Sequence, residues 1–298
     1  MPEGLIVKAL SGYYYVKPDQ AGVDTIVQCR GRGIFKKKGL TPLVGDRVIY
    51  TPTENGEGTV DELLPRETEL IRPPVANASL AVLLFSVKEP DLNLQLLDKF
   101  LVHIEHAGLR ALICLTKHDL MDAQEDEQVA RAVELYEQVG YKVLVTSSLK
   151  GEGMERVKEN LAGHISVFAG QSGVGKSSLL NAMLPGLTLE TSEISMRLGR
   201  GRHTTRHVEL IELENGAYVA DTPGFSQLDF LELGVDELSI CFIEFAPLAE
   251  QCKFRGCSHL HEPGCRVREA VEAGGIAASR YEHYVEFFQE MKDKKRRY

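Results

Sequence analysis

The segment 170–177 constrains the fold of this chain more than any other stretch. It reads Gly-Gln-Ser-Gly-Val-Gly-Lys-Ser and matches the phosphate-binding pattern G-x-x-x-x-G-K-[ST] at every fixed position. The apolar run 165–169 before it is typical of a buried strand, and 178–182 after it is typical of the start of a helix. A glycine-rich turn that binds nothing would not need this context. The segment therefore predicts an α/β protein with a P-loop.

The P-loop supplies most of the predicted nucleotide-binding residues. Its glycines let backbone N–H groups surround the phosphates, and the helix that follows adds the positive end of its dipole. Lys176 is expected to hold the outer phosphates and is therefore also a candidate catalytic residue, while the Ser177 hydroxyl is expected to bind Mg²⁺. The predicted phosphate-binding positions are Gly170, Gln171, Ser172, Gly173, Val174, Gly175, Lys176, Ser177 and Ser178.

A second motif, Thr116-Lys117-His118-Asp119, follows the apolar run 111–115. That run reads as a buried strand, and open α/β sheets place their ligand loops at such strand ends. An aspartate there accepts hydrogen bonds from guanine N1–H and N2–H₂, donors that adenine does not present in that form. We therefore expect Asp119 to select GTP over ATP, with the Lys117 stem along the base and Thr116 bracing the neighbouring loop. The usual motif begins with Asn, so Thr116 is a departure from it.

A serine pair, Ser147-Ser148, follows the next predicted strand, 142–145. Its backbone N–H groups would reach guanine O6 if this loop joins the base site. By itself a serine pair predicts only a loop.

The motif Asp-Thr-Pro-Gly at 221–224 follows the predicted strand 217–220 and matches the D-x-x-G switch pattern. Asp221 is expected to reach Mg²⁺ through water, and the Gly224 N–H is expected to contact the γ-phosphate, so that hydrolysis would release both. Phe225 stands where many GTPases have the glutamine that orients the attacking water. The intrinsic turnover is therefore expected to be slow.

The basic, glycine-rich segment 199–206 lies between the P-loop and this switch motif. One of its threonines is expected to complete the Mg²⁺ shell when GTP is bound. We narrowly prefer Thr205 to Thr204 and count Thr205 as a catalytic residue. His203 is a candidate to position the attacking water, and contact with RNA or solvent is an equal alternative for it.

The order of these motifs differs from that of an ordinary small GTPase, which begins with its P-loop. Here base recognition precedes phosphate binding, and the γ-phosphate sensor comes last. All of these loops leave the same edge of a parallel sheet, so circular permutation preserves the site. We predict a circularly permuted P-loop GTPase domain over 73–228. The short β-rich runs of 1–72 predict an OB-type β-barrel that binds RNA, and 229–298 predicts a zinc-binding helical module.

Three of the 6 cysteines lie close together near the C-terminus, at Cys252, Cys257 and Cys265. With one histidine they supply three thiolates and one imidazole, a donor set that suits a closed tetrahedral Zn²⁺ site. Spacing alone leaves His259 and His261 open as the fourth ligand. Four protein ligands leave no open position, so this Zn²⁺ would be structural rather than catalytic.

The distribution of charge bears on the partners. The formal net charge is −9, yet 30–38 is basic without an acid and the chain ends in the basic run 292–298. Such patches fit a polyanion such as RNA, although a solvated loop and tail would look the same. No apolar run approaches the roughly 20 residues that span a membrane, and the N-terminus lacks the features of a signal peptide. We expect a cytoplasmic protein with no membrane contact and reduced cysteines.

Three further segments carry a family resemblance: Cys-Arg-Gly-Arg-Gly-Ile-Phe at 29–35, Thr-Pro-Leu-Val-Gly-Asp at 41–46 and Gly-Arg-His-Thr-Thr-Arg at 201–206. With the barrel and the permuted motifs, they make essentially the whole chain resemble the family of ribosome small subunit-dependent GTPase A (RsgA, or YjeQ). The resemblance implies a GTPase that binds the 30S subunit and its 16S rRNA, assists late subunit maturation, and hydrolyses GTP to GDP and phosphate with stimulation by the subunit. It also favours His259 as the fourth zinc ligand. We expect a monomer with Mg²⁺ beside GTP and one structural Zn²⁺.

Two other classes of function compete with this interpretation. A zinc-stabilised RNA-binding protein with a vestigial nucleotide site would need neither Lys176 nor Asp221. An ATP-dependent phosphotransferase is disfavoured by Asp119 and by the lack of a recognisable acceptor site. Nucleotide-selective hydrolysis separates all three classes.

Overall fold

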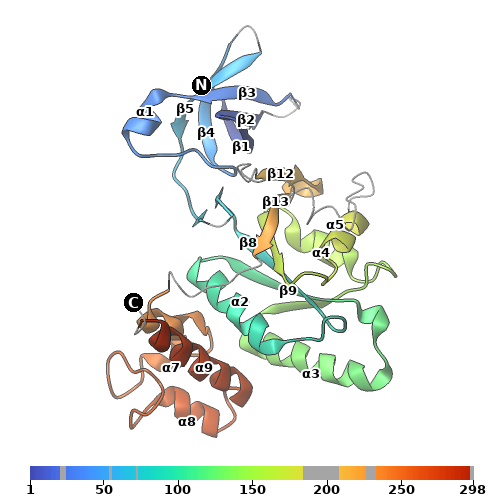
Figure 1. The fold of residues 1–298 in the computed structure, drawn as a ribbon, viewed down its shortest axis with the longest axis vertical. Helices are drawn as coiled ribbons and strands as arrows, with labels where there is room; N and C mark the ends of the chain where they lie inside the picture. The colour runs from blue at the N-terminus through green and yellow to red at the C-terminus, as the bar shows by residue number, and fades with distance from the viewer. Residues whose placement is uncertain (21–24, 54–55, 72, 184–207, 226–232, 296–298) are drawn as a thin grey trace. The chain divides into compact units, whose positions relative to one another are not determined.

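The computed structural model describes residues 1–20, 25–53, 56–71, 73–183, 208–225 and 233–295 (Figure 1). The chain forms two compact units, each built from several segments. The first comprises Met1–Val82, Met154–Gly170 and Lys176–Phe225, and the second comprises Leu83–Gly153, Gln171–Gly175 and Ser226–Tyr298. The division between them falls within a strand and within the P-loop.

The first unit begins with a closed five-stranded barrel (Figure 1). Its strands are β1 (Glu3–Leu10), β2 (Tyr13–Pro18), β3 (Val27–Gly31), β4 (Arg47–Pro52) and β5 (Glu57–Leu63), with helix α1 (Gly33–Lys37) after β3. They pair in the order β1-β2-β3-β5-β4, and β4 pairs again with β1 to close the barrel. Only β3 and β5 pair in parallel among these neighbours. The predicted OB-type barrel is confirmed, with β5 and α1 as elements that the sequence did not predict.

A small hairpin follows the barrel. Its strands are β6 (Glu69–Leu70) and β7 (Val75–Ala76). Val75 forms a parallel bridge with Val44, and Asn77 Nδ2 donates a hydrogen bond of 2.9 Å to the Gly45 carbonyl. The barrel loop around residue 45 is thus tied to residues 75–77, which lie beyond the expected domain boundary at 72.

The rest of the first unit contains the strand that leads into the P-loop. This strand, β11 (Ile165–Gly170), pairs in parallel with β13 (Tyr218–Phe225), which pairs antiparallel with β12 (Glu209–Glu212). An Asn-Gly turn at 215–216 joins β12 to β13, and Asn215 adopts a left-handed φ of 58°. Strand β13 runs to Phe225, so the Asp-Thr-Pro-Gly motif lies inside the strand rather than after it. Helices α4 (Met154–Leu161) and α5 (Lys176–Met183) pack on each other.

Strand β12 also pairs with the barrel. Lys8 of β1 lies opposite Glu209, and the two side chains form an ion pair of 2.8 Å. Lys17 of β2 forms a second ion pair, with Glu212. The barrel is therefore joined to the GTPase hairpin by backbone pairing and by charge.

The second unit contains three strands in the order β10-β9-β8. They are β8 (Leu80–Ser86), which begins in the first unit, β9 (Arg110–Thr116) and β10 (Lys142–Val145). All seven residues of β8 are buried, as expected for a strand covered on both faces. Helix α2 (Leu94–His106) follows β8 and helix α3 (Ala123–Val139) follows β9. Asn93 caps α2 by accepting a hydrogen bond of 2.9 Å from the Leu96 N–H.

The C-terminal helices belong to the same unit. They are η3 (Val235–Cys241), α7 (Ala246–Ala249), α8 (Arg266–Glu272) and α9 (Ala278–Lys295). Their core includes Val102 of α2 as well as residues of their own. The buried members are Val102, Leu233, Leu238, Cys241, Phe242, Phe245, Cys265, Val267, Ile276, Tyr284, Phe287, Phe288 and Met291. The C-terminal helices and α2 therefore fold around one shared core.

A buried ion network lies beside this core. Arg280 of α9 is 1% exposed and donates to Asp98 of α2 at 2.6 Å. Its guanidinium also donates to both carboxylate oxygens of Glu244, at 2.7 and 2.8 Å. Asp98 accepts further hydrogen bonds from Tyr136 of α3 at 2.7 Å and from His283 at 2.6 Å. One buried carboxylate thus connects α2, α3 and α9.

Among the residues that the structure describes, no helix has both the length and the apolar composition needed to cross a bilayer.

Candidate functional site

The P-loop has the backbone geometry that phosphate binding requires. The predicted strand and helix on either side of the P-loop are present. Strand β11 ends at Gly170, one residue later than predicted, and helix α5 begins at Lys176, two residues earlier. Gly173 and Gly175 adopt φ angles of 82° and 90°, which strain any residue with a side chain. A Cβ atom added to either glycine would meet no atom within 4 Å, so the backbone at these positions is open to a ligand. The segment therefore fits a bound phosphate.

A hydrogen bond joins the P-loop to the strand that carries the base-recognition motif. Thr116, the last residue of β9, is buried, and its Oγ1 donates to the Val174 carbonyl at 2.5 Å. Val174 is itself buried within the P-loop. The side chain of Thr116 therefore fixes the position of the P-loop backbone relative to the end of β9.

The residues after Thr116 form a tight turn. Lys117 adopts left-handed angles of φ 60° and ψ 33° and precedes the short helix η1 (His118–Leu120). Such a conformation costs a non-glycine residue on the order of 1 kcal/mol or more and is concentrated at functional sites. The Lys117 ammonium donates to the Glu89 carbonyl, which holds the turn. The turn places Asp119 in the first turn of η1.

The structure brings the aspartate motif and the serine pair together. The Ser147 hydroxyl donates to the Asp119 carboxylate, although the two residues are 28 positions apart. Ser147 is fully buried, its N–H donates to the Glu152 carbonyl at 3.0 Å, and its Oγ accepts from the Lys150 N–H at 3.2 Å. Ser148 is half-buried next to it. The loop after β10 thus orients the carboxylate that is expected to bind guanine.

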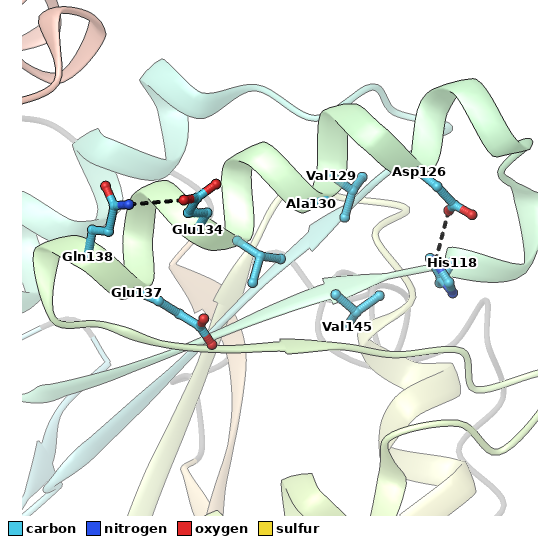
Figure 2. A pocket seen from close by; sticks show the side chains of 9 residues that line it. His118, Asp126, Val129, Ala130, Glu134, Glu137, Gln138 and Val145 are labelled. Atoms are coloured by element: carbon cyan, nitrogen blue, oxygen red, sulfur yellow. Dashed lines mark hydrogen bonds and ion pairs between the residues drawn. The ribbon is translucent and has the colours of Figure 1, made fainter.

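His118 lies on another side of this turn. Its Nε2 is 3.0 Å from Asp126 Oδ1 of α3 (Figure 2). Its Nδ1 is 3.8 Å from Glu152 Oε2. The side chain is therefore engaged with acidic groups near α3.

The remaining predicted nucleotide residues divide into two groups. Lys176 and Ser177 are half-buried in the first turn of α5. His203, Thr204 and Thr205 lie outside the described residues, as does the side chain of Asp221. The backbone of Asp221 and Gly224 belongs to β13.

Four side chains near the C-terminus form the candidate metal centre. The ligand atoms of Cys252, Cys257, His259 and Cys265 all lie within 4.8 Å of one another. His259 Nδ1 is 3.4 Å from Cys265 Sγ and 3.7 Å from Cys252 Sγ. Zinc bonds of about 2.3 Å to sulfur and about 2.0 Å to nitrogen place tetrahedral ligands about 3.5–3.8 Å apart. The cluster therefore fits a Zn²⁺ ion, and it contains His259 whereas His261 is exposed.

Hydrogen bonds position the histidine of this centre. His259 adopts a left-handed φ of 57° and is 1% exposed. The Tyr281 hydroxyl donates to the His259 carbonyl at 2.7 Å, and the Tyr284 hydroxyl donates to the Ser258 carbonyl at 2.7 Å. Burial lowers the pKa of His259 and so favours the neutral imidazole that binds metals. Both tyrosines belong to α9, and their role in orienting this loop was not predicted from the sequence.

Glu262 braces the same loop and was not predicted from the sequence. Its carboxylate accepts hydrogen bonds from the Ser258 N–H at 2.9 Å, from the Ser258 hydroxyl at 2.6 Å, and from the N–H groups of Leu260 and His261 at 3.1 Å each. Burial raises the pKa of Glu262, but these hydrogen bonds outweigh it and lower that pKa to about 2. The only sequence signal was a serine four residues before an acid in a short loop.

Comparison with known protein families decides the family. A model described as RsgA GTPase matches residues 63–231, and a model described as RsgA N-terminal domain matches residues 3–60. The chain belongs to the RsgA GTPase family. Among RsgA relatives, a protein of Geobacillus kaustophilus (strain HTA426) named small ribosomal subunit biogenesis GTPase RsgA is 52% identical over the full length of both chains. The protein of the same name from Shouchella clausii (strain KSM-K16) is 51% identical, also over both full lengths.

Two solved structures share the fold. YloQ, described as a circularly permuted GTPase, aligns with a TM-score of 0.87 and 45% identity, covering 99% of this chain and 96% of that one. YjeQ from Thermotoga maritima aligns with a TM-score of 0.87 and 40% identity, covering 97% and 98%. The predicted circularly permuted GTPase fold is confirmed.

Proposed function

We propose that this RsgA family member is a GTPase that binds the small (30S) ribosomal subunit and assists its late maturation. It hydrolyses GTP to GDP and phosphate, slowly alone and faster on the subunit. The observation that carries this proposal is the 52% identity, over the full length of both chains, to a protein named small ribosomal subunit biogenesis GTPase RsgA. The barrel within 1–72 and the module within 229–298 contact 16S rRNA, and the GTPase domain occupies 73–228. The protein acts as a monomer in the cytoplasm.

The turn at the end of β9 selects guanine. Asp119 accepts the N1–H and N2–H₂ of guanine with the oxygen lone pairs that Ser147 leaves free, since a carboxylate has about four acceptor sites. Lys117 lies along the base, and the backbone of Ser147 and Ser148 faces guanine O6. The hydrogen bond from Thr116 to Val174 supports this role, because it ties the base-recognition turn to the phosphate-binding loop.

The P-loop and the segments after it bind the phosphates and support hydrolysis. The backbone N–H groups of 170–175 and the Lys176 ammonium bind the phosphates, and the Gly224 N–H senses the γ-phosphate. Ser177, Thr205 and Asp221 would hold Mg²⁺, which neutralises charge on the phosphate oxygens. His203 orients the attacking water when the subunit is bound, which accounts for slow turnover in its absence.

The metal centre has a structural role in this proposal. Cys252, Cys257, His259 and Cys265 would hold Zn²⁺ with no open coordination position. Burial raises the pKa of Cys257 to about 12, so a bound cation is needed to keep that thiolate charged.

A hydrolysis assay tests the proposed function. GTP and ATP turnover are measured with the purified protein alone and with purified 30S subunits, using Lys176→Ala as the inactive variant and Lys158→Ala, on the surface of α4, as the matched control. We expect GTP-selective turnover that the subunits stimulate and that only Lys176→Ala removes. Intact RNA binding without stimulated turnover would instead favour the RNA-binding protein with a vestigial nucleotide site.

A further inference from the structure

An open groove in the second unit is not used by the proposed nucleotide chemistry. It has a volume of about 640 Å³ and lies between α3 and the end of β10, with η1 at one end (Figure 2). Its floor is formed by small aliphatic side chains: Val129, Ala130 and Val133 of α3, and Val145 of β10. The floor therefore suits a ligand with small apolar side chains.

The rim of the groove is acidic. Helix α3 carries five carboxylates and one cation, Arg131, which pairs with Glu127 at 2.6 Å. Glu134 and Glu137 line the groove and form no ion pair with any lysine or arginine in the described part of the chain. Two carboxylates beside an apolar floor repel RNA phosphates and attract a cationic polypeptide.

The edge of β10 adds a third recognition element. This strand pairs in parallel with β9 on one side, and no strand of the described residues pairs with its other edge. An open edge presents unpaired backbone N–H and C=O groups, to which an extended peptide can add as a further strand. In such a strand, alternate side chains would face the floor and the acidic rim.

We propose that this groove binds an extended, lysine- or arginine-rich segment with small aliphatic residues, supplied by a protein of the small ribosomal subunit. The source of the segment rests on the proposed function, whereas its chemistry rests on the floor, the rim and the strand edge. Aliphatic side chains fill the space above Val133 and Val145, and cationic side chains pair with Glu134 and Glu137. Because the groove ends at His118, the bound segment lies beside the turn that carries Asp119.

Peptide binding tests the chemistry of the groove without ribosomes. The probe is a fluorescein-labelled peptide in which lysine and valine alternate, titrated with the full-length protein by fluorescence anisotropy. We expect binding that weakens with salt and a loss of about tenfold or more in Glu134→Lys/Glu137→Lys. The matched control, Glu272→Lys/Glu282→Lys, makes the same change in net charge on α8 and α9 and should bind as the wild type does. An equal loss in both variants, or no binding by the wild type, overturns the proposal.

Photo-crosslinking tests the source of the segment. Ala130 is exposed on the floor, so it is replaced by p-benzoylphenylalanine, with Glu282 replaced in the control protein. On irradiation with purified 30S subunits, we expect a cross-link from position 130 to a ribosomal protein. A cross-link to rRNA, to a second copy or within the chain overturns the assignment, as does no cross-link despite co-sedimentation. Failure to co-sediment with the subunits would contradict the proposed function, and peptide binding would still decide the chemistry of the groove.

Discussion

Thr116 and Val174 are 58 positions apart in the chain, yet the hydroxyl of the first donates to the carbonyl of the second at 2.5 Å. The bond connects the end of β9, where the base-recognition turn begins, to the middle of the P-loop. It gives a physical role to Thr116, which stands where the usual base-recognition motif begins with Asn. Threonine supplies one donor to the loop and otherwise packs as a small branched side chain at the end of a buried strand.

The variant Thr116→Val is expected to bind GTP about tenfold more weakly. Removing the hydroxyl leaves the buried Val174 carbonyl without this donor, which costs roughly 1–3 kcal/mol. Thr116→Ser is the matched control because it keeps the donor. Calorimetric titration with GTP and GDP measures both variants. Wild-type affinity in Thr116→Val would show that the bond does not set the position of the P-loop.

Asp119→Asn is expected to shift base preference from GTP toward XTP. The substitution removes the acceptor for guanine N1–H and N2–H₂. Because these donors are then left unpaired, the preference for GTP should fall by at least about 100-fold. The Asn carbonyl oxygen can still accept from Ser147, so the turn should stay in place. Competition between GTP and XTP measures the preference. The control Asp126→Asn removes a carboxylate that contacts His118 and should keep the wild-type preference.

Arg280→Met is expected to lower the free energy of unfolding by about 3–5 kcal/mol. The substitution leaves the buried carboxylate of Asp98 and the partly buried carboxylate of Glu244 without their cation. Arg131→Met removes an exposed partner of Glu127 and should change stability by no more than about 0.5 kcal/mol. Urea unfolding followed by circular dichroism compares them. Similar stability of the two variants would show that the buried network contributes little.

Zinc removal is expected to loosen the C-terminal helices and α2 together while leaving GTP binding largely intact. The ligand Cys265 belongs to the same buried core as Val102 of α2. Hydrogen exchange before and after chelation should therefore show faster exchange in both regions, reversed by added Zn²⁺. Cys257→Ser should lose the metal, measured by elemental analysis, and Cys241→Ser should retain it. Retention of one zinc per chain by Cys257→Ser would remove Cys257 from the ligand set.

Much of the fold follows from local patterns in the sequence. The apolar runs at β8, β9 and β11 predict buried strands, and most residues of each strand are buried in the structure. Helix α2 is predicted because Leu97, Phe100, Leu101 and Ile104 recur on one face. The P-loop and the candidate metal ligands are predicted because their chemistry needs fixed residue types at short spacing.

The elements that were not predicted depend on distant contacts. Strand β5 contains glycine and three acids, and it becomes a strand because β3 and β4 pair with it on both sides. The contact between Asp119 and Ser147 depends on the turn at Lys117. The left-handed conformation of Lys117 cannot be predicted from the periodicity of apolar residues. Asp98 and Arg280 are 182 positions apart, and each reads in isolation as an ordinary charged residue on a helix surface.

That separation also affects the order in which the contacts of the second unit can form during synthesis. Asp98 leaves the ribosome well before Arg280, which is added 182 residues later. Domains generally begin to fold during translation from the N-terminal side, but α2 lacks the cation for its buried carboxylate until Arg280 of α9 has been made. The five strands of the barrel, by contrast, all lie within Glu3–Leu63, so they can pair with one another long before Arg280 is made. The second unit therefore completes its core only after α9 has been made, and newly made chains that stop short of α9 would leave Asp98 without its cation.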